Sequence, residues 1–460
     1  MSEQTTPSRR SFVKGVGGSV ALGMGAAYVP SSVKGANDKL NVAVIGVGGR
    51  GSSLLREVCG LRDSKGILEV IGVCDIYMKR VDRAVEVSGA KGYTDYKELL
   101  QVKELDAVII ATPDHWHAQM AIDACNAGKD VYLEKPMTHT TDEARELWQV
   151  VKKTGKVLQV GSQTTSQDIW WKARQVMSSK VMGKHIMSQG SYHRNSVDGE
   201  WNYNIDPEAG PNAEGDNRLI WEKWLGSAPK MDYDSDRYFR FRKYWDYSGG
   251  IATDLFYHVV APLQICWGGG EFPYRVTGTG GRFVFTDDRE VPDTFTLTAD
   301  YKTGHHLALT SSMANGTHVP GLLRGHEATL MLVEHGRFEG RADYITLTPE
   351  GQFADGFRER CEDAGLEGEW IEQAVKVRGK RGDSIISVLQ MPVETRQTHM
   401  ENFLECVKTR EKPVLDVLTG FKALATIDLA VESFKRGRTM YFDDKTYKMT
   451  ETPIKDPVHG

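Results

Sequence analysis

The chain has 460 residues, which is enough for two or three domains with sizeable hydrophobic cores. Its 57 lysines and arginines nearly balance its 62 aspartates and glutamates, and the net charge of -5 gives no reason to expect a nucleic acid or an anionic membrane as a partner. Apolar residues make up 40% of the chain, and no apolar run after the N-terminus is long enough to span a bilayer.

Residues 1–36 have the pattern of a twin-arginine export signal. In the string SRRSFVK two arginines precede Phe12 and Lys14, and a short, glycine-rich, weakly apolar stretch follows. A basic region, an apolar region too short for a transmembrane helix and then polar residues are the order of such a signal. The alternative is a disordered tail with a chance arginine pair. We expect export to the periplasm, or otherwise out of the cytoplasm by this route, with the mature chain starting near Ala36.

From Lys39 onward, apolar runs alternate with segments of helical spacing. The runs LNVAVIGVG, LEVIGVCD, LDAVIIATP, DVYLEKP and KVLQVGSQ are typical of buried strands. Continuous apolar strands that alternate with helices predict a parallel sheet covered on both faces. The pattern closes near Gly161, so we place a first α/β domain at residues 37–165.

The pattern changes after Gln167, and we place a second α/β domain at residues 166–460. A helix, WWKARQVMSS, leads into the alternating segments HIMSQGSYHR, YRVTGTGGRFVF, DTFTLTADYK and HHLALTSSMA, which predict antiparallel strands with one buried face. Two helices follow from Met400. Residues 195–247 form a long irregular stretch; loops of this length are usually functional or disordered, and the aromatic residues in this one favour function. These aromatics are either core packing or a wall that stacks on sugar rings.

The first strand runs into a glycine-rich turn, GVGGRG, that opens a helix. In a G-x-G-x-x-G turn, Gly46 permits the tight bend, Gly48 lets the backbone approach a pyrophosphate, and Gly51 allows close packing of helix and strand. Asp75 ends the second strand at the spacing of a ribose-binding carboxylate, which favours NAD, whereas Arg80 would make NADP possible. The alternative is a glycine-rich turn with an unrelated aspartate. We therefore predict an NAD-binding Rossmann domain.

The segment TPDHWH follows the fourth strand, at the sheet edge where such folds bind ligands. A metal site would need further ligands, and no spacing in the sequence supplies them, so we predict cofactor and substrate contacts and no metal. The predicted cofactor-binding residues are Gly46, Gly48, Gly49, Arg50, Gly51, Asp75, Arg80, Thr112, Pro113, His115, His117, Glu134, Lys135 and Gln163.

Two further segments, LEKP and GGIATDLFYH, carry groups that could act on a substrate. Lys135 ends the fifth strand beside the nicotinamide, where its charge would face a reacting oxygen, with Glu134 as its possible partner. His258 could take a hydroxyl proton, with Asp254 four residues earlier as its orienting partner. The alternatives are a surface salt bridge and a core histidine. The predicted substrate-binding residues are Lys135, Tyr192, Arg194, Tyr244, Trp245, Asp254 and His258.

Together, GxGxxG, Asp75, TPDxxH, AGKDVYLEKP and GGxxxDxxxH resemble the Gfo/Idh/MocA oxidoreductases in their order. The resemblance covers nearly the whole mature chain, and EKP followed by DxxxH is its most specific part. It implies a Rossmann domain and an α/β domain whose large, mostly antiparallel sheet mediates oligomerisation as a dimer or tetramer. It also implies that Lys135, Asp254 and His258 form the catalytic group. Phe256 departs from the family, where many members have glycine.

We therefore predict an NAD(P)-dependent oxidoreductase that acts on a hydroxyl of a sugar, polyol or glycoside, with a tightly held cofactor. Two alternatives remain open. In an NAD-dependent glycosidase, oxidation, elimination and reduction would cleave a glycoside with no net redox change. A non-catalytic NAD-dependent protein is disfavoured, because every presumed catalytic position is filled.

Overall fold

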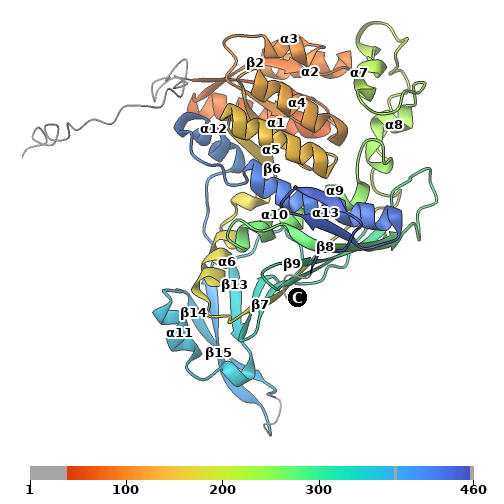
Figure 1. The fold of residues 1–460 in the computed structure, drawn as a ribbon. Helices are drawn as coiled ribbons and strands as arrows, with labels where there is room; N and C mark the ends of the chain where they lie inside the picture. Colours follow the sequence, from red (N-terminus) through yellow and green to blue (C-terminus); the bar gives the residue numbers. More distant parts are fainter. Residues whose placement is uncertain (1–38, 378–380, 456–460) are drawn as a thin grey trace, which may run out of the picture. The chain divides into compact units, whose positions relative to one another are not determined.

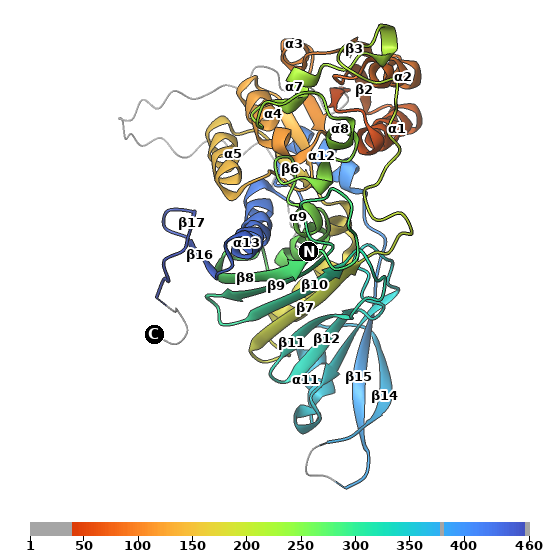
Figure 2. The ribbon, with the colours of Figure 1, turned by 90° about the vertical axis from the view of Figure 1, so that its right-hand side faces the viewer.

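The structure, a computed structural model, describes residues 39–377 and 381–455. The predicted export signal at residues 1–36 lies outside the described residues. From residue 39 onward the chain forms one compact unit that contains two β-sheets, with helices between them (Figures 1 and 2). No helix within the described ranges is long and apolar enough to cross a membrane.

The first sheet is parallel throughout and has the strand order β3-β2-β1-β4-β5-β6, which confirms the predicted Rossmann-type sheet. Its central strands are buried on both faces because helices cover each side. The order reverses between β1 and β4, and such a switch point opens a crevice at the carboxyl edge of the sheet. The strands are β1 (Leu40–Ile45), β2 (Leu68–Cys74), β3 (Lys91–Tyr93), β4 (Ala107–Ile110), β5 (Asp130–Glu134) and β6 (Leu158–Gly161).

The helices of this domain pack on the sheet through two apolar clusters. One cluster joins α1 to the sheet and includes α12 (His399–Thr409), which comes from the far end of the chain. Residues 399–409 therefore pack with the first domain, although the predicted boundary assigns them to the second. The other cluster contains apolar residues of α4 and α5. The helices are α1 (Gly49–Lys65), α2 (Met78–Ser88), α3 (Tyr96–Leu100), α4 (Asp114–Asn126) and α5 (Thr141–Thr154).

The second sheet has eleven strands in the order β14-β15-β13-β12-β11-β7-β10-β9-β8-β16-β17. Every pairing in it is antiparallel except that of β7 with β10, which confirms the prediction of a large, mostly antiparallel sheet. The strands are β7 (His185–His193), β8 (Pro273–Gly281), β9 (Thr294–Tyr301), β10 (His306–Ser312), β11 (Gly321–Gly325), β12 (Ala328–Val333), β13 (Tyr344–Pro349), β14 (Glu369–Val375), β15 (Ser384–Pro392), β16 (Met440–Asp443) and β17 (Lys448–Thr450).

Helices α9, α10 and α13 lie between the two sheets (Figure 1) and share one large apolar core with both domains. Asp254 and His258, which lie four residues apart, belong to two helices, α9 and α10, that are divided at Phe256. The helices of this domain are η1 (Gln163–Ser166), α6 (Asp168–Ser179), α9 (Gly250–Leu255), α10 (Tyr257–Cys266), η4 (Gly351–Phe353), α11 (Phe357–Asp363) and α13 (Val417–Arg436).

Residues 195–247, which we call the aromatic segment, lie along the first domain (Figure 1). Their rings form a separate apolar cluster with Tyr77, which follows β2, and a backbone bridge joins Tyr77 to Leu219. The segment contains η2 (Gly215–Asn217), α7 (Trp221–Leu225), α8 (Ser235–Phe239) and η3 (Phe241–Lys243). It therefore bridges the two domains along the side of the crevice.

Candidate active site

A cavity of about 1490 Å³ lies at the carboxyl edge of the first sheet. The ends of β1, β2, β4 and β5 form one wall, α9 and α10 contribute Asp254 and His258, and residues of the aromatic segment line a further part. The predicted glycine turn, Lys135, Asp254 and His258 therefore line one space, although they are far apart in the sequence.

The GVGGRG turn has no room for side chains where the backbone must bend and pack. Gly46 has a φ of +82°, and a Cβ on Gly51 would lie 1.7 Å from the carbonyl oxygen of Gly46. Asp75 braces the turn from β2, because its carboxylate accepts the N–H groups of Val47 (2.9 Å) and Tyr77 (3.0 Å). This tight turn ahead of α1 leaves the helix N-terminus open to the cavity, which suits a pyrophosphate.

Arg80 connects the aromatic segment with the glycine turn. A Cβ on Gly48 would lie 3.2 Å from Nη1 of Arg80. The Arg80 guanidinium carbon stands 5.1 Å from the ring centre of Tyr238 and 5.9 Å from that of Phe239, both in the aromatic segment. A cation held against aromatic faces in this way is fixed in position beside the turn.

The sequence suggested Glu134 as the partner of Lys135, but Glu134 does not pair with the ammonium group of Lys135. Its Oε1 accepts from Nε of Arg50 at 2.7 Å and from Nε2 of Gln163 at 2.7 Å. Only the backbone N–H of Lys135 reaches Glu134, at 3.1 Å from Oε2. Glu134 therefore holds the side chains of Arg50 and Gln163 in position, and both residues line the cavity.

Lys135 pairs instead with Asp254, across the gap between the domains. Its Nζ lies 2.6 Å from Oδ1 and 3.1 Å from the carbonyl oxygen of Asp254. Arg242, from the aromatic segment, donates through Nε to the same Oδ1 at 3.1 Å. Burial favours the neutral acid, but Lys135, Arg242 and Arg194 together hold the pKa of Asp254 well below its usual range. Asp254 is therefore a carboxylate that orients Lys135.

His258 is buried beside a carboxylate that the sequence interpretation missed. Its Nδ1 lies 3.2 Å from Oε1 of Glu339, and among the described residues no hydrogen bond joins it to Asp254. The expected pairing of Asp254 with His258 is thus replaced by two separate pairs. Burial and the nearby charge of Lys135 lower the pKa of His258 to about 4, so the ring is neutral near pH 7 and can accept a proton.

Several other predicted residues lie outside the lining of the cavity. His115 contacts the carbonyl oxygen of Trp224 at 2.9 Å, and burial lowers its pKa to about 3. His117 bridges the carbonyl oxygens of Pro136 (2.6 Å) and Thr112 (2.9 Å). Both histidines therefore support the walls of the crevice. The remaining predicted residues outside the lining are Gly51, Tyr192, Tyr244 and Trp245.

The aromatic residues serve mainly as a core. Trp221 and Trp224 are buried and stack with their ring centres 4.8 Å apart. Trp116, in α4, donates its indole N–H to the carbonyl oxygen of Trp224 at 2.7 Å. Several rings do line the cavity, including the half-exposed Tyr203. Core packing is therefore confirmed for the buried rings, and a wall that stacks on sugar rings stays a prediction for those that line the cavity.

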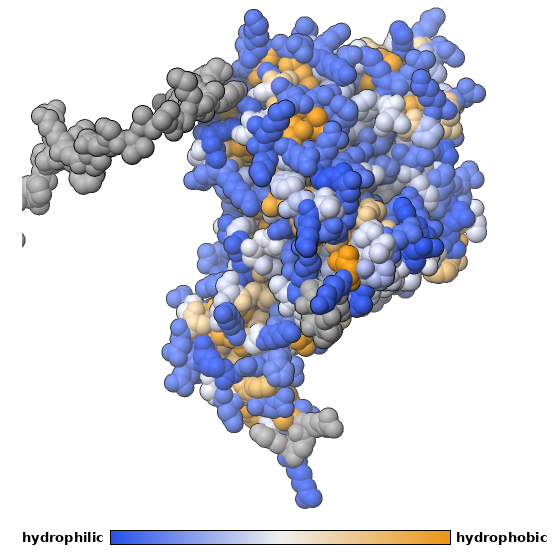
Figure 3. All heavy atoms as spheres, in the orientation of Figure 1, coloured by the Kyte–Doolittle hydropathy of each residue, from blue (hydrophilic) through white to orange (hydrophobic). Residues whose placement is uncertain are grey.

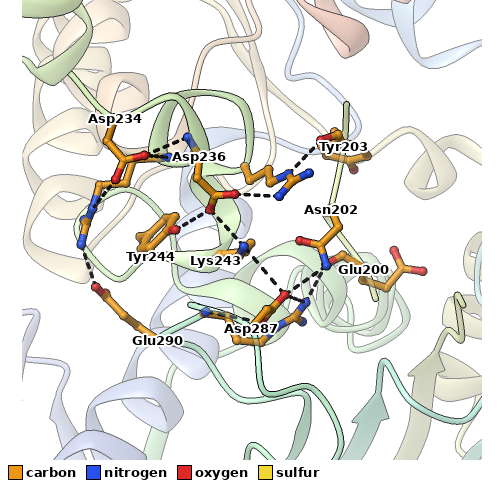
Figure 4. Close-up of polar contacts among 12 residues, drawn as sticks. Glu200, Asn202, Tyr203, Asp234, Asp236, Lys243, Tyr244, Asp287 and Glu290 are labelled. Carbon is orange, nitrogen blue, oxygen red and sulfur yellow. Dashed lines mark hydrogen bonds and ion pairs between the residues drawn. The ribbon is translucent and has the colours of Figure 1, made fainter. Parts of the chain in front are cut away.

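A polar network ties the aromatic segment to the second domain (Figure 4). Lys243 is 2% exposed, and its Nζ lies 3.0 Å from Asp236 and 3.7 Å from Asp287. Asp287 also binds the guanidinium group of Arg289 through two hydrogen bonds and accepts from Asn202 at 3.0 Å.

In the described part of the chain, no three histidine, cysteine or acidic side chains are grouped so that they could hold a metal ion.

Two family models match the chain. Residues 40–162 match the model described as "Oxidoreductase family, NAD-binding Rossmann fold", and residues 194–279 match "Oxidoreductase family, C-terminal alpha/beta domain". The first match confirms the predicted NAD-binding fold, and its residues include the GVGGRG turn, Asp75 and Lys135.

The chain is also similar to characterised proteins over part of its length. It is 30% identical over 161 residues to an inositol 2-dehydrogenase of Salmonella typhimurium, covering 34% of this chain and 47% of that protein. It is 34% identical over 176 residues to an alpha-N-acetylgalactosaminidase of Shewanella oneidensis, covering 32% of this chain and 38% of that protein. The chain thus spans less than half the length of these relatives.

Solved structures share the fold over most of the chain. An aldose-aldose oxidoreductase from Caulobacter crescentus complexed with glycerol has a TM-score of 0.60 at 14% identity, covering 88% of this chain and 100% of that one. The WlbA dehydrogenase from Chromobacterium violaceum, in complex with NADH and UDP-GlcNAcA, has a TM-score of 0.58 at 18% identity, covering 88% and 96%. Residues 40–162 and 194–279, with one match in each of the two observed domains, thus fit two models of the Gfo/Idh/MocA oxidoreductase family.

Proposed function

We propose that the protein is an NAD(P)-dependent oxidoreductase that transfers a hydride between its cofactor and a hydroxyl-bearing carbon of a sugar, polyol or glycoside. One observation carries the proposal: Lys135 and His258 line the same cavity as the glycine turn. The turn fits the cofactor, because Gly51 has no space for a side chain and Asp75 stands beside it. When bound there, NAD would supply the hydride acceptor.

The residues of the chain would accept the proton and stabilise the negative charge that accompany hydride transfer. Neutral His258 would accept the hydroxyl proton of the substrate. The ammonium group of Lys135, oriented by Asp254, would stabilise negative charge on the same oxygen. Both side chains are nearly buried, and a charge acts more strongly where water is excluded.

A redox-neutral glycosidase is a second candidate, because the chain resembles an alpha-N-acetylgalactosaminidase over 176 residues. The same polar residues serve both reactions, so an assay must separate them. The test is incubation with p-nitrophenyl glycosides, free sugars and polyols at catalytic and at stoichiometric NAD. Nitrophenol release at catalytic NAD identifies the glycosidase, whereas NADH formed in proportion to a sugar identifies the dehydrogenase. No turnover on a broad panel with cofactor bound would contradict both.

We further propose that residues 1–36 direct export by the twin-arginine route, and that NAD is bound before export and retained. Free NAD is expected to be scarce outside the cytoplasm, so an enzyme that released its cofactor each turnover would stall. The aromatic segment supports retention because it is anchored over the cavity. Asp206, within it, accepts from the hydroxyl of Tyr77 at 2.7 Å and from Nζ of Lys79 at 2.9 Å.

Protein purified from the periplasm without added cofactor is expected to carry NAD at close to one molecule per chain. Denaturation followed by quantification of the released nucleotide checks this. Asp206→Ala should lose NAD faster on dialysis, because two anchors of the aromatic segment are removed. Glu208→Ala, an exposed neighbour in the same segment, is the control. An apo preparation that gains activity only at millimolar NAD would contradict retention.

We also propose that the second sheet mediates a homo-oligomer, a dimer or tetramer. Most side chains on the face shown in Figure 3 are hydrophilic. Three exposed large apolar residues, Ile186, Tyr344 and Ile385, belong to strands of the second sheet. Light scattering on the purified protein is expected to give two or four times the chain mass, and Ile385→Glu should lower it. A monomer at micromolar concentration would contradict this.

A further inference from the structure

We propose that Glu339 is the positioning residue of His258, an inference that rests on the proposed function of the same cavity. Glu339 lines the cavity, and its Oε1 lies 3.2 Å from Nδ1 of His258. Nδ1 is buried and makes no well-aligned hydrogen bond within the described residues. Such a nitrogen is costly without a partner, and contacts of this kind often tighten only when the substrate binds.

The fold holds the backbone just before Glu339 in place. Glu339 belongs to the connection between β12 and β13, and its neighbour Phe338 is fully buried with its ring stacked on Trp170 at 5.2 Å. Gly336 has a φ of +72°, and a Cβ on it would lie 2.1 Å from the carbonyl oxygen of Val319. The backbone that leads into Glu339 is thus fixed, so little conformational entropy is lost when its carboxylate engages His258.

Hydrogen bonds also fix the carboxylate itself. Oε2 of Glu339 accepts from the hydroxyl of Tyr192, and Nη2 of Arg194 donates to that hydroxyl at 2.9 Å. Arg194 has a carboxylate partner of its own in Glu200, at 3.6 Å. This chain of contacts leaves Oε1 of Glu339 for His258.

A carboxylate at Nδ1 selects the ring tautomer that the reaction needs. With the proton on Nδ1, facing Glu339, the other ring nitrogen is free to accept a proton from the substrate. Asp254 does not take this role in the structure: no hydrogen bond among the described residues joins it to His258, and its Oδ1 accepts from Lys135 and Arg242. Glu339 would also stabilise the imidazolium that forms when the ring is protonated.

The charged groups around His258 predict the direction of the pH effect. Burial is the largest cause of its lowered pKa of about 4; Lys135 and Arg194 lower it, and Glu339 and Asp254 raise it. Removal of the Glu339 charge should therefore lower the pKa of His258 further. The acid limb of kcat/KM, where the ring becomes protonated, should move to lower pH while the plateau falls. A purely structural role for Glu339 would not move the limb in this direction.

The test compares Glu339→Gln with Glu339→Asp and with the control Glu334→Gln, which removes an exposed carboxylate of the same connection between β12 and β13, outside the cavity lining. The probes are myo-inositol, D-glucose and p-nitrophenyl β-D-glucoside with NAD. Glu339→Gln is expected to lower kcat about 100-fold with KM nearly unchanged, since general base catalysis accelerates a reaction by about 10²–10⁴-fold. Glu339→Asp should recover part of the loss, and Glu334→Gln should stay close to the parent. Parental kcat and an unmoved acid limb in Glu339→Gln would overturn the inference.

A second measurement separates this inference from the proposed function. In protein labelled with ¹⁵N-histidine, the signal of His258, assigned with His258→Gln, reports which ring nitrogen carries the proton. The inference requires the proton on Nδ1 in the parent and a changed tautomer balance in Glu339→Gln. A parent ring protonated on Nε2 would overturn it whatever the activity. If no probe is turned over but the proton is on Nδ1, the reaction proposed for the cavity fails and the pairing of Glu339 with His258 stands.

Discussion

Lys135→Ala is expected to lower kcat by about 10²–10³-fold, the range for loss of one group that stabilises developing charge, while NAD binding stays roughly intact. The ammonium group lies 2.6 Å from Oδ1 of Asp254, and Lys135 lines the cavity. Arg242 remains bonded to Asp254 in the variant, so the change leaves no buried carboxylate without a partner. The fold should therefore survive the substitution.

The measurement is steady-state kinetics on the substrate identified with the panel of p-nitrophenyl glycosides, sugars and polyols. The NAD content of each preparation is determined alongside. Lys172→Ala is the matched control, because Lys172 is also nearly buried beside acidic partners, Asp168 and Glu394, but lies outside the cavity lining. Unchanged turnover in Lys135→Ala would contradict the proposal that Lys135 stabilises charge on the substrate oxygen. A fall in NAD content without a fall in kcat per bound NAD would assign Lys135 to cofactor binding instead.

Gly51→Ala is expected to weaken NAD binding by at least about 100-fold, or about 2.8 kcal/mol. The added Cβ would lie 1.7 Å from the carbonyl oxygen of Gly46, which no real structure tolerates, so helix α1 must move away from the turn. The free N–H groups at the start of α1 would then no longer converge where a pyrophosphate binds.

The control for this variant lies in the same helix. A Cβ on Gly60 would meet nothing within 4 Å, and alanine in a helix interior is more stable than glycine by about 0.8–1 kcal/mol. Gly60→Ala should therefore keep its NAD and melt at or above the parental temperature. Calorimetric titration of NAD into stripped protein, with thermal melting in parallel, checks both variants. Parental affinity in Gly51→Ala would show that the turn does not hold the cofactor.

Much of the first domain could be predicted from the sequence, because its signals are local. Apolar strands alternate with amphipathic helices, and the GVGGRG turn and Asp75 occupy the structural positions that their spacing predicts. The conformation of a turn and the periodicity of a strand depend on neighbours in the chain. For the same reason the sequence indicated that Lys135 ends a strand at the edge that binds ligands, where the cavity lies.

Contacts between distant segments required the tertiary structure. Glu134 is adjacent to Lys135 in the chain, yet neighbours on a strand point to opposite faces, and the ammonium group meets Asp254 instead. Glu339 carries no local signal, since a carboxylate in a loop between two strands is usually solvated. Only the pairing of β12 with β13, and the burial of Phe338, bring it to His258.

The sequence by itself thus determined the fold of each of the two domains, the glycine turn and the positions of the main polar groups. It could do so because backbone geometry and apolar periodicity depend on residues that are close in the chain. The tertiary structure alone decided which charge pairs with which, where α12 packs, and how much of the aromatic segment is core. Those outcomes depend on burial, and burial depends on how the whole chain packs together.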